Sequence, residues 1–168
     1  MSEHPETCIA LAIGSNIGDR LEALRAAIKA MQPYITVTTV SPVYETAAAY
    51  VAAQPAYLNA ALTGTTQIEP LALLWMLKDI ESEIGRLPTF RYGPRLIDID
   101  IVFYGDLILE TQELSIPHLR MGERDFVLRP LNDIAPDWVH PQNGKTVAQL
   151  LAALPGNDMT ALGDLLCA

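Results

Sequence analysis

Hydrophobic residues recur along this chain with two periods, which predict both strands and helices. Four segments have the apolar or β-branched composition of strands: residues 7–13, 35–44, 57–66 and 96–104. Two others repeat hydrophobic residues every three or four positions, as a helix face does: Leu21, Leu24, Ile28 and Met31, then Leu73, Leu77, Ile80 and Ile84. Asp19 and Glu22 form a capping-box pattern before the first helix. Pro70 opens the second helix and Gly85 ends it.

The order strand, helix, strand, strand, helix, strand predicts an α+β, ferredoxin-like split βαβ core. We expect a mainly antiparallel sheet with both helices on one face, and a second face left for loops and a site. A C-terminal extension follows, with a hairpin across Gly105-Asp106, a weak helix over 147–154, and a tail whose leucines pack against the body. Because no repeat or linker divides the chain, residues 1–168 are expected to form a single domain.

The composition of the chain argues against some classes of binding partner. The net charge is −9, which disfavours nucleic acid, whose phosphates favour a basic surface. No apolar run is long enough to cross a bilayer, and the polar start lacks the pattern of a secretory signal. Cys8 and Cys167 lie at opposite ends, which predicts neither a disulfide framework nor a zinc site. We therefore expect a cytoplasmic protein, monomeric by default, with no membrane or nucleic-acid partner.

The arginines are unevenly distributed for an acidic chain, since most of them lie between Arg86 and Arg129. Such a cluster fits a pocket for a small anion. It also fits a set of solvated loop charges, and composition alone favours that second interpretation.

The strongest local pattern is the segment Asp98-Ile99-Asp100-Ile101. On a strand, residues two apart point to the same side, so Asp98 and Asp100 share one face. Ile97, Ile99, Ile101 and Phe103 are then expected to fill the other face. Mg2+ prefers one or two carboxylates together with substrate phosphates, so the pair is a candidate metal site. The alternative is an ordinary amphipathic strand that shows two acids to water.

The residues before this strand favour the metal site. Arg86, Arg91 and Arg95 lie on the preceding loop, and a guanidinium donates two parallel hydrogen bonds to phosphate oxygens. Carboxylates that hold metal beside arginines that hold phosphate are suited to phosphoryl-type transfer, in which two metal ions could bridge the phosphate oxygens.

Other residues are weaker candidates. Tyr57 and Asn59 are two apart on a predicted strand, so an aromatic ring and an amide share a face suited to a flat heterocycle. His118 could contact phosphate or be a simple loop histidine. The turn from Gly14 to Gly18 lacks the Gly-Lys-Ser/Thr ending of a P-loop, and we interpret it as structural.

Several segments together resemble one family, the 6-hydroxymethyl-7,8-dihydropterin pyrophosphokinases, over roughly the first 150 residues. The most distinctive is Arg91-Tyr92-Gly93-Pro94-Arg95-Leu96-Ile97-Asp98-Ile99-Asp100-Ile101. The others are Leu11 to Asn16, Gln54 to Ala60, Glu81 to Arg86, Ile116-Pro117-His118, Met121, Arg124, Phe126 to Leu128, Pro130-Leu131, Ile134 to Asp137 and His140-Pro141.

The resemblance implies transfer of pyrophosphate from ATP to the hydroxymethyl group of the pterin, with release of AMP, in folate biosynthesis. It implies two Mg2+ ions held by Asp98 and Asp100, with Arg86 and Arg95 also catalytic. The implied ATP-site residues are Glu81, Arg91, Arg95, Ile101, Ser115, His118 and Arg124. The implied pterin-site residues are Tyr57, Asn59, Tyr92 and Phe126. The loops 45–55 and 86–92 are expected to act as lids.

This chain departs from the family pattern at two loops. It lacks a second arginine soon after Arg86, and Tyr92 replaces a tryptophan. Thr46-Ala47-Ala48-Ala49-Tyr50 stands where proline and glycine are frequent. A rival hypothesis remains, a non-catalytic ferredoxin-like module that binds an anionic metabolite. It explains the arginines and the fold but gives the aspartate pair no task.

Overall fold

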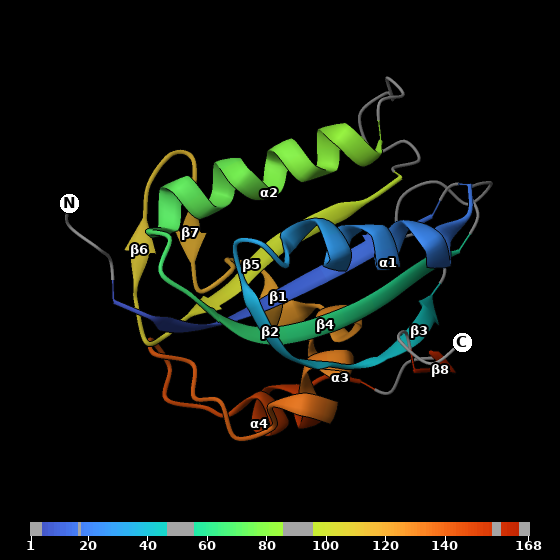
Figure 1. The fold of residues 1–168 in the computed structure, drawn as a ribbon. Helices are drawn as coiled ribbons and strands as arrows, with labels where there is room; N and C mark the ends of the chain where they lie inside the picture. Colours follow the sequence, from blue (N-terminus) through green and yellow to red (C-terminus); the bar gives the residue numbers. More distant parts are fainter. Residues whose placement is uncertain (1–4, 17, 47–55, 86–95, 156–158, 165–168) are drawn as a thin grey trace.

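The fold is described from a computed structural model, over residues 5–16, 18–46, 56–85, 96–155 and 159–164 (Figure 1). The elements are β1 (Thr7–Ser15), α1 (Arg20–Met31), β2 (Thr36–Val40), β3 (Pro42–Thr46), β4 (Tyr57–Thr66), α2 (Pro70–Ile84), β5 (Asp98–Tyr104), β6 (Leu109–Glu110), β7 (Ser115–Ile116), the 3-10 helix Met121–Glu123, α3 (Asp125–Ile134), α4 (Val147–Ala152) and β8 (Thr160–Asp164).

A six-stranded antiparallel sheet organises the described part of the molecule. Its strands lie in the order β5-β1-β4-β3-β8, and β2 also pairs with β4. β1 lies between β4 and β5, and it pairs with β4 from Thr7 to Ser15. The α+β, mainly antiparallel fold predicted from the sequence is confirmed.

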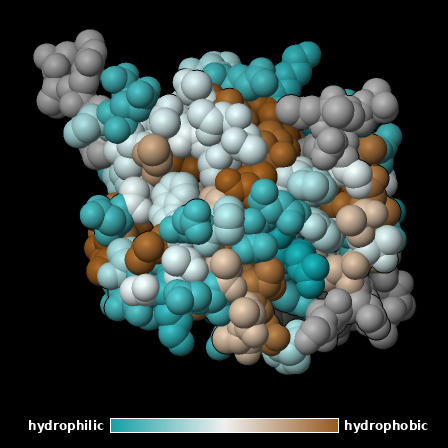
Figure 2. All heavy atoms as spheres, turned by 90° about the horizontal axis from the view of Figure 1, so that it is seen from below, coloured by the Kyte–Doolittle hydropathy of each residue, from teal (hydrophilic) through white to brown (hydrophobic). Residues whose placement is uncertain are grey.

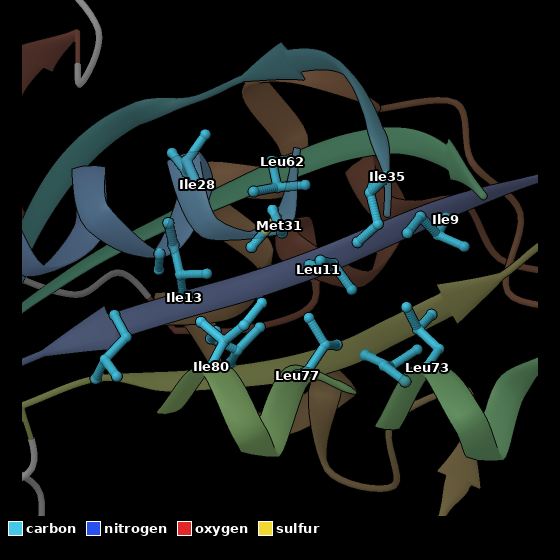
Figure 3. Packing of buried hydrophobic residues seen from close by; sticks show 14 of the residues in the cluster. Ile9, Leu11, Ile13, Ile28, Met31, Ile35, Leu62, Leu73, Leu77 and Ile80 are labelled. Carbon is cyan, nitrogen blue, oxygen red and sulfur yellow. The ribbon is translucent and has the colours of Figure 1, made fainter. Parts of the chain in front are cut away.

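The main hydrophobic core lies between the sheet and the helices α1 and α2. Both helices cover the same face (Figure 1). Ile9, Leu11 and Ile13 of β1 alternate toward this face, where Leu73, Leu77 and Ile80 of α2 and Ile28 and Met31 of α1 point toward them (Figure 3). The helix starts follow local chemistry: the Asp19 carboxylate accepts from the Glu22 N–H at 3.1 Å, and Pro70 stands in the first turn of α2.

The opposite face carries a second core, which the prediction of a face left for loops and a site did not include. Ala10, Ala61 and Phe103 from the sheet pack there with Leu128 of α3 and Leu150 of α4. Helix α3 was missed because Pro130 lies inside it, which is normally a sign of a helix end. Pro130 is buried in this helix.

A β-bulge in β5 corrects the predicted position of Phe103. The β1–β5 register passes from Leu11–Ile101 to Ala10–Phe103, so β5 has one extra residue there. The alternation reverses at this point, and Val102 and Phe103 both lie in the second core. Ile97, Ile99 and Ile101 remain in the main core, as predicted.

The remaining differences also have local causes. The predicted strand 35–44 is divided at Ser41, whose hydroxyl accepts from the Ala61 N–H and donates to the Pro42 carbonyl, both at 2.8 Å. The hairpin expected across Gly105 is wrong. Gly105 adopts φ +57° and turns the chain away, and β6 pairs with β7 instead. The tail adds β8 to β3, and Leu162 is exposed rather than packed.

Candidate active site

The two acids of β5 share one face of the sheet, on the side of α3 and α4. Their neighbours Ile99 and Ile101 point into the main core on the opposite face. Asp98 is partly buried and Asp100 is exposed. With a residue repeat of two, their side chains leave the strand roughly 7 Å apart along the chain.

A row of paired residues runs across the sheet from Asp98. Asp98 pairs with Gly14, Gly14 pairs with Asn59, and Asn59 pairs with Tyr44. Paired residues of antiparallel strands point to the same side, so Asp98 and Asn59 lie about 10 Å apart across Gly14, which is two strand spacings. Asp98 and Asn59 are therefore on the same face of the sheet.

Gly14 makes room for the amide of Asn59. A Cβ atom at Gly14 would lie 2.8 Å from the Asn59 Oδ1 atom and 3.8 Å from Tyr57 Cδ1. Asn59 is buried, and its Nδ2 donates to the Thr46 Oγ1 at 3.1 Å. The structure thus brings Tyr57 and Asn59 together beside Gly14, at the end of β4.

The N-terminal end of α3 brings two more predicted residues to this side of the sheet. Phe126 packs against the second core, as does Ala12, which pairs with Asp100. The Arg124 guanidinium lies over the Phe126 ring, 5.5 Å from its centroid. Seen from the side of α3 and α4, hydrophilic areas alternate with smaller hydrophobic ones (Figure 2).

His118 lies within electrostatic reach of Asp100. Burial lowers the pKa of its imidazole, the Asp100 carboxylate opposes this, and Arg124 and Arg120 lower the pKa further. Its ring Nδ1 accepts from the Arg120 backbone N–H at 3.2 Å, and its backbone N–H donates to the Val102 carbonyl at 3.0 Å. A neutral His118 with Nδ1 occupied as an acceptor carries its proton on Nε2.

Glu81 of α2 reaches the open edge of β5. Its carboxylate accepts from the Ile99 N–H at 2.7 Å. Burial raises its pKa to about 7, against the Ile99 hydrogen bond, and the charges of Asp98 and Asp100 raise it further.

Ile101 and Ser115 lie along this same edge. The Ile101 side chain is buried in the main core, so only its backbone can meet a ligand there. Ser115 belongs to β7, which lies against β5. Glu81, the Ile101 backbone and Ser115 therefore lie around the open edge of β5.

Four predicted residues lie outside the described part of the chain: Arg86, Arg91, Tyr92 and Arg95. So do most of the two loops expected to act as lids. These residues and lids stay predictions.

The described acids fit a hard divalent cation in part. Asp98 and Asp100 are hard oxygen donors. The charge of Asp100 raises the pKa of both Glu81 and His118, and that of Asp98 raises the pKa of Glu81. Among the described residues, no group of three His, Cys, Asp or Glu side chains could hold a metal ion by itself. Such a pair still suits Mg2+, which commonly takes one or two carboxylates and completes its shell with water and phosphate.

Sequence reasoning missed two residues of this region. Gly14 was interpreted only as part of a turn, because its closeness to Asn59 depends on strand register. Arg20 was not singled out, although it bonds both Glu45 and the Ala56 carbonyl. A cation at the first position of a helix is unfavourable for the macrodipole, and this was the available signal.

The fold and this face define a class: a ferredoxin-like α+β domain with paired acids, an amide and an aromatic ring on one side of its sheet. The sequence profile of the family described as 7,8-dihydro-6-hydroxymethylpterin-pyrophosphokinase (HPPK) matches residues 10–136. The chain belongs to this family.

Similar proteins agree with this assignment. The chain is 41% identical over 154 residues to the 2-amino-4-hydroxy-6-hydroxymethyldihydropteridine pyrophosphokinase of Synechocystis, covering 89% of this chain and 78% of that protein. It is 42% identical over 145 residues to the folic acid synthesis protein FOL1 of Dictyostelium discoideum, covering 86% of this chain but only 22% of that protein. A crystal structure of Plasmodium falciparum HPPK-DHPS shares the fold, with a TM-score of 0.74 and 18% identity over 90% of this chain and 46% of that one.

The chain thus spans about a fifth of the FOL1 relative and most of the Synechocystis one. Among the described residues, no helix has both the length and the apolar character needed to cross a membrane.

Proposed function

We propose that this chain transfers a pyrophosphoryl group from ATP to the hydroxymethyl oxygen of 6-hydroxymethyl-7,8-dihydropterin, releasing AMP, as a step of folate biosynthesis. Membership of the family supports the reaction. The observation that carries it is the row across the sheet, in which Asp98 and Asn59 share one face on either side of Gly14. A phosphate-activating group and a heterocycle-binding amide about 10 Å apart suit a reaction between a nucleotide and a flat alcohol.

In this reaction the hydroxymethyl oxygen bonds to the β-phosphorus of ATP. The bond from the β-phosphorus to the oxygen bridging it to the α-phosphate breaks, AMP leaves with that oxygen, and the hydroxyl proton passes to solvent. Two Mg2+ ions, which Asp98 and Asp100 would hold, neutralise phosphate charge and lower the pKa of the hydroxyl when bound. No covalent intermediate on the protein is needed.

The described residues then have distinct tasks. Asn59 offers its amide to the polar edge of the pterin, and the rings of Tyr57 and Phe126 offer flat apolar contact. Arg124 and the Nε2–H of a neutral His118 donate to phosphate oxygens. Glu81, the Ile101 backbone and Ser115 line the nucleotide site along the open edge of β5.

The residues outside the described ranges complete the proposal. In this proposal Arg91 and Arg95 bind the triphosphate, Arg86 or Arg91 stabilises the transferring group, and Tyr92 contributes an aromatic ring to the pterin site. The loops 45–55 and 86–92 close on the substrates and exclude water.

The experiment is an assay of nucleotide products with the purified chain, ATP, Mg2+ and hydroxymethyl-dihydropterin. AMP that forms only when the pterin is present supports the proposed reaction. ADP as the product would instead indicate transfer of a single phosphoryl group. Binding of pterin and nucleotide with no product would favour the rival, a non-catalytic module for an anionic metabolite.

A further inference from the structure

Arg20 connects three elements at one corner of the sheet. It is the first residue of α1, and its Nη1 donates to the Glu45 carboxylate at 2.9 Å and to the Ala56 carbonyl at 2.7 Å. Glu45 is the second-last residue of β3, and Ala56 directly precedes β4. The Arg20 side chain is only 28% exposed, so this contact is partly shielded from water.

Among the described residues, the ladders that hold β4 end next to this corner. The β1–β4 ladder ends with the pair Ser15–Leu58, and the β3–β4 ladder ends with Thr46–Tyr57. Ala56 is beyond both ladders. Strand ends that lack ladder partners open more readily than strand centres, so the Arg20 bond restrains a position that the sheet leaves weakly held.

An arginine at the first position of α1 indicates that the Arg20 side chain serves the contact with Ala56 rather than the helix. A cation in the first turn of a helix opposes the helix macrodipole, which favours anions such as Glu22 there. Arg20 therefore contributes nothing favourable to α1 through its charge. The hydrogen bond from Arg20 to the Ala56 carbonyl is charge-assisted and goes to the backbone. It therefore restrains the chain at position 56 without depending on the Ala56 side chain.

We propose that Arg20 is a positioning residue of the pterin site. By holding the Ala56 carbonyl and Glu45 together, it fixes the start of β4, so that Tyr57 and Asn59 keep their places beside Gly14. Arg20 acts through these residues and touches no reacting atom. This inference rests on the proposed function for the identity of the flat ligand.

If Arg20 positions the pterin site, its substitution should change KM for the pterin but not KM for ATP. Arg20→Met keeps a side chain of similar length and removes both hydrogen bonds. We expect this variant to raise KM for the pterin about tenfold, with kcat and KM for ATP changed by less than about twofold. Arg20→Lys retains a cation with several donors, so it should recover much of the loss.

Two further variants distinguish the carbonyl contact from charge alone. Glu45→Gln leaves the bond to Ala56 intact, so its pterin KM should rise by about threefold or less. Lys29→Met removes a cation of the same sign from the exposed far end of the same helix and should leave both KM values unchanged.

Pterin binding gives a readout that does not depend on turnover. Fluorescence titration with hydroxymethyl-dihydropterin, Mg2+ and a non-hydrolysable ATP analogue should show a Kd about tenfold weaker for Arg20→Met than for the parent chain. If the parent chain binds pterin but forms no AMP, the proposed reaction fails while this comparison still tests Arg20.

Three results would overturn the inference. One is an unchanged pterin Kd and KM in Arg20→Met, which, beside a lowered thermal midpoint, would assign Arg20 a structural role only. Another is an equal rise in KM for pterin and ATP. The third is a parent chain that does not bind pterin at all, which would end both this inference and the proposed function.

Discussion

The two faces of the sheet differ most along β1, which carries large side chains on one face and small ones on the other. On the face under α1 and α2, β1 contributes Ile9, Leu11 and Ile13, all at most 2% exposed. On the opposite face the same strand contributes Ala10, Ala12 and Gly14. On one face β1 fills the space with its own large side chains, whereas on the other it leaves space above its backbone.

That space has two uses. Over Ala10 and Ala61 it is filled by α3 and α4, which form the second core. Toward Gly14 and Ala12 it lies beside polar side chains, with Asp98, Asp100 and Asn59 on the same surface. Stability and ligand binding are therefore expected to divide between the faces, and substitutions on each can test this division.

The largest effect is expected from the acids of the open face. Asp98→Asn or Asp100→Asn removes a negative charge while keeping the shape of the side chain. If these carboxylates hold Mg2+, AMP formation should fall at least about a thousandfold, with little change in thermal unfolding. Asp106→Asn makes the same change at an exposed position just beyond β5 and serves as the control. Near-normal activity in both site variants would leave the acid pair without a catalytic role.

The opposite result is expected on the packed face. Leu11→Ala leaves a cavity at a fully buried position, which should lower the free energy of unfolding by about 3 kcal/mol. Urea denaturation measures this loss, and Leu119→Ala, at a side chain that is 74% exposed, is the matched control. We expect the folded fraction of Leu11→Ala to keep its activity. A specific loss of pterin binding in that variant would contradict the division between the faces.

Sequence patterns predicted what depends on neighbours along the chain. The bounds of β4, the start of α2 at Pro70 and the shared side of Asp98 and Asp100 all follow from local periodicity and from proline or glycine signals. Sequence patterns could not predict features that depend on the pairing between strands. The bulge that turns Phe103 to the other face and the meeting of Gly14 with Asn59 are set by register, and α3 forms around an internal proline because its neighbours bury it.

Gly14→Ala tests the meeting of Gly14 and Asn59. The new Cβ would lie 2.8 Å from the Asn59 Oδ1, so the amide must move. We expect KM for the pterin to rise about tenfold and the free energy of unfolding to fall by about 1 kcal/mol or more. Gly122→Ala is the control, because nothing lies within 4 Å of the position of its Cβ. An unchanged pterin KM in Gly14→Ala would show that the position of the Asn59 amide is not critical for binding.

The smallest effect is expected at Glu81. This residue of α2 contacts β5, the edge strand that carries Asp98 and Asp100. Burial raises the pKa of its carboxyl to about 7 from an ordinary value of 4.5, so the folded chain binds a proton there more tightly than the unfolded chain does. The stability linked to this proton is fully present below pH 4.5 and is lost as the pH rises through about 7. Glu81→Gln stays neutral at every pH and can still accept from the Ile99 N–H.

In EDTA, the variant and the parent chain should therefore have the same free energy of unfolding near pH 4.5. At pH 8 that of the variant should be higher by on the order of 1 kcal/mol, a value reduced because Glu81 is partly exposed to solvent. Urea denaturation at the two pH values measures the difference. Asp79→Asn removes a carboxylate at an exposed position of the same helix and is the matched control. The contrary result is that the stabilities of parent and variant change in parallel between these pH values. It would show that the Glu81 carboxylate is well solvated and that burial does not raise its pKa.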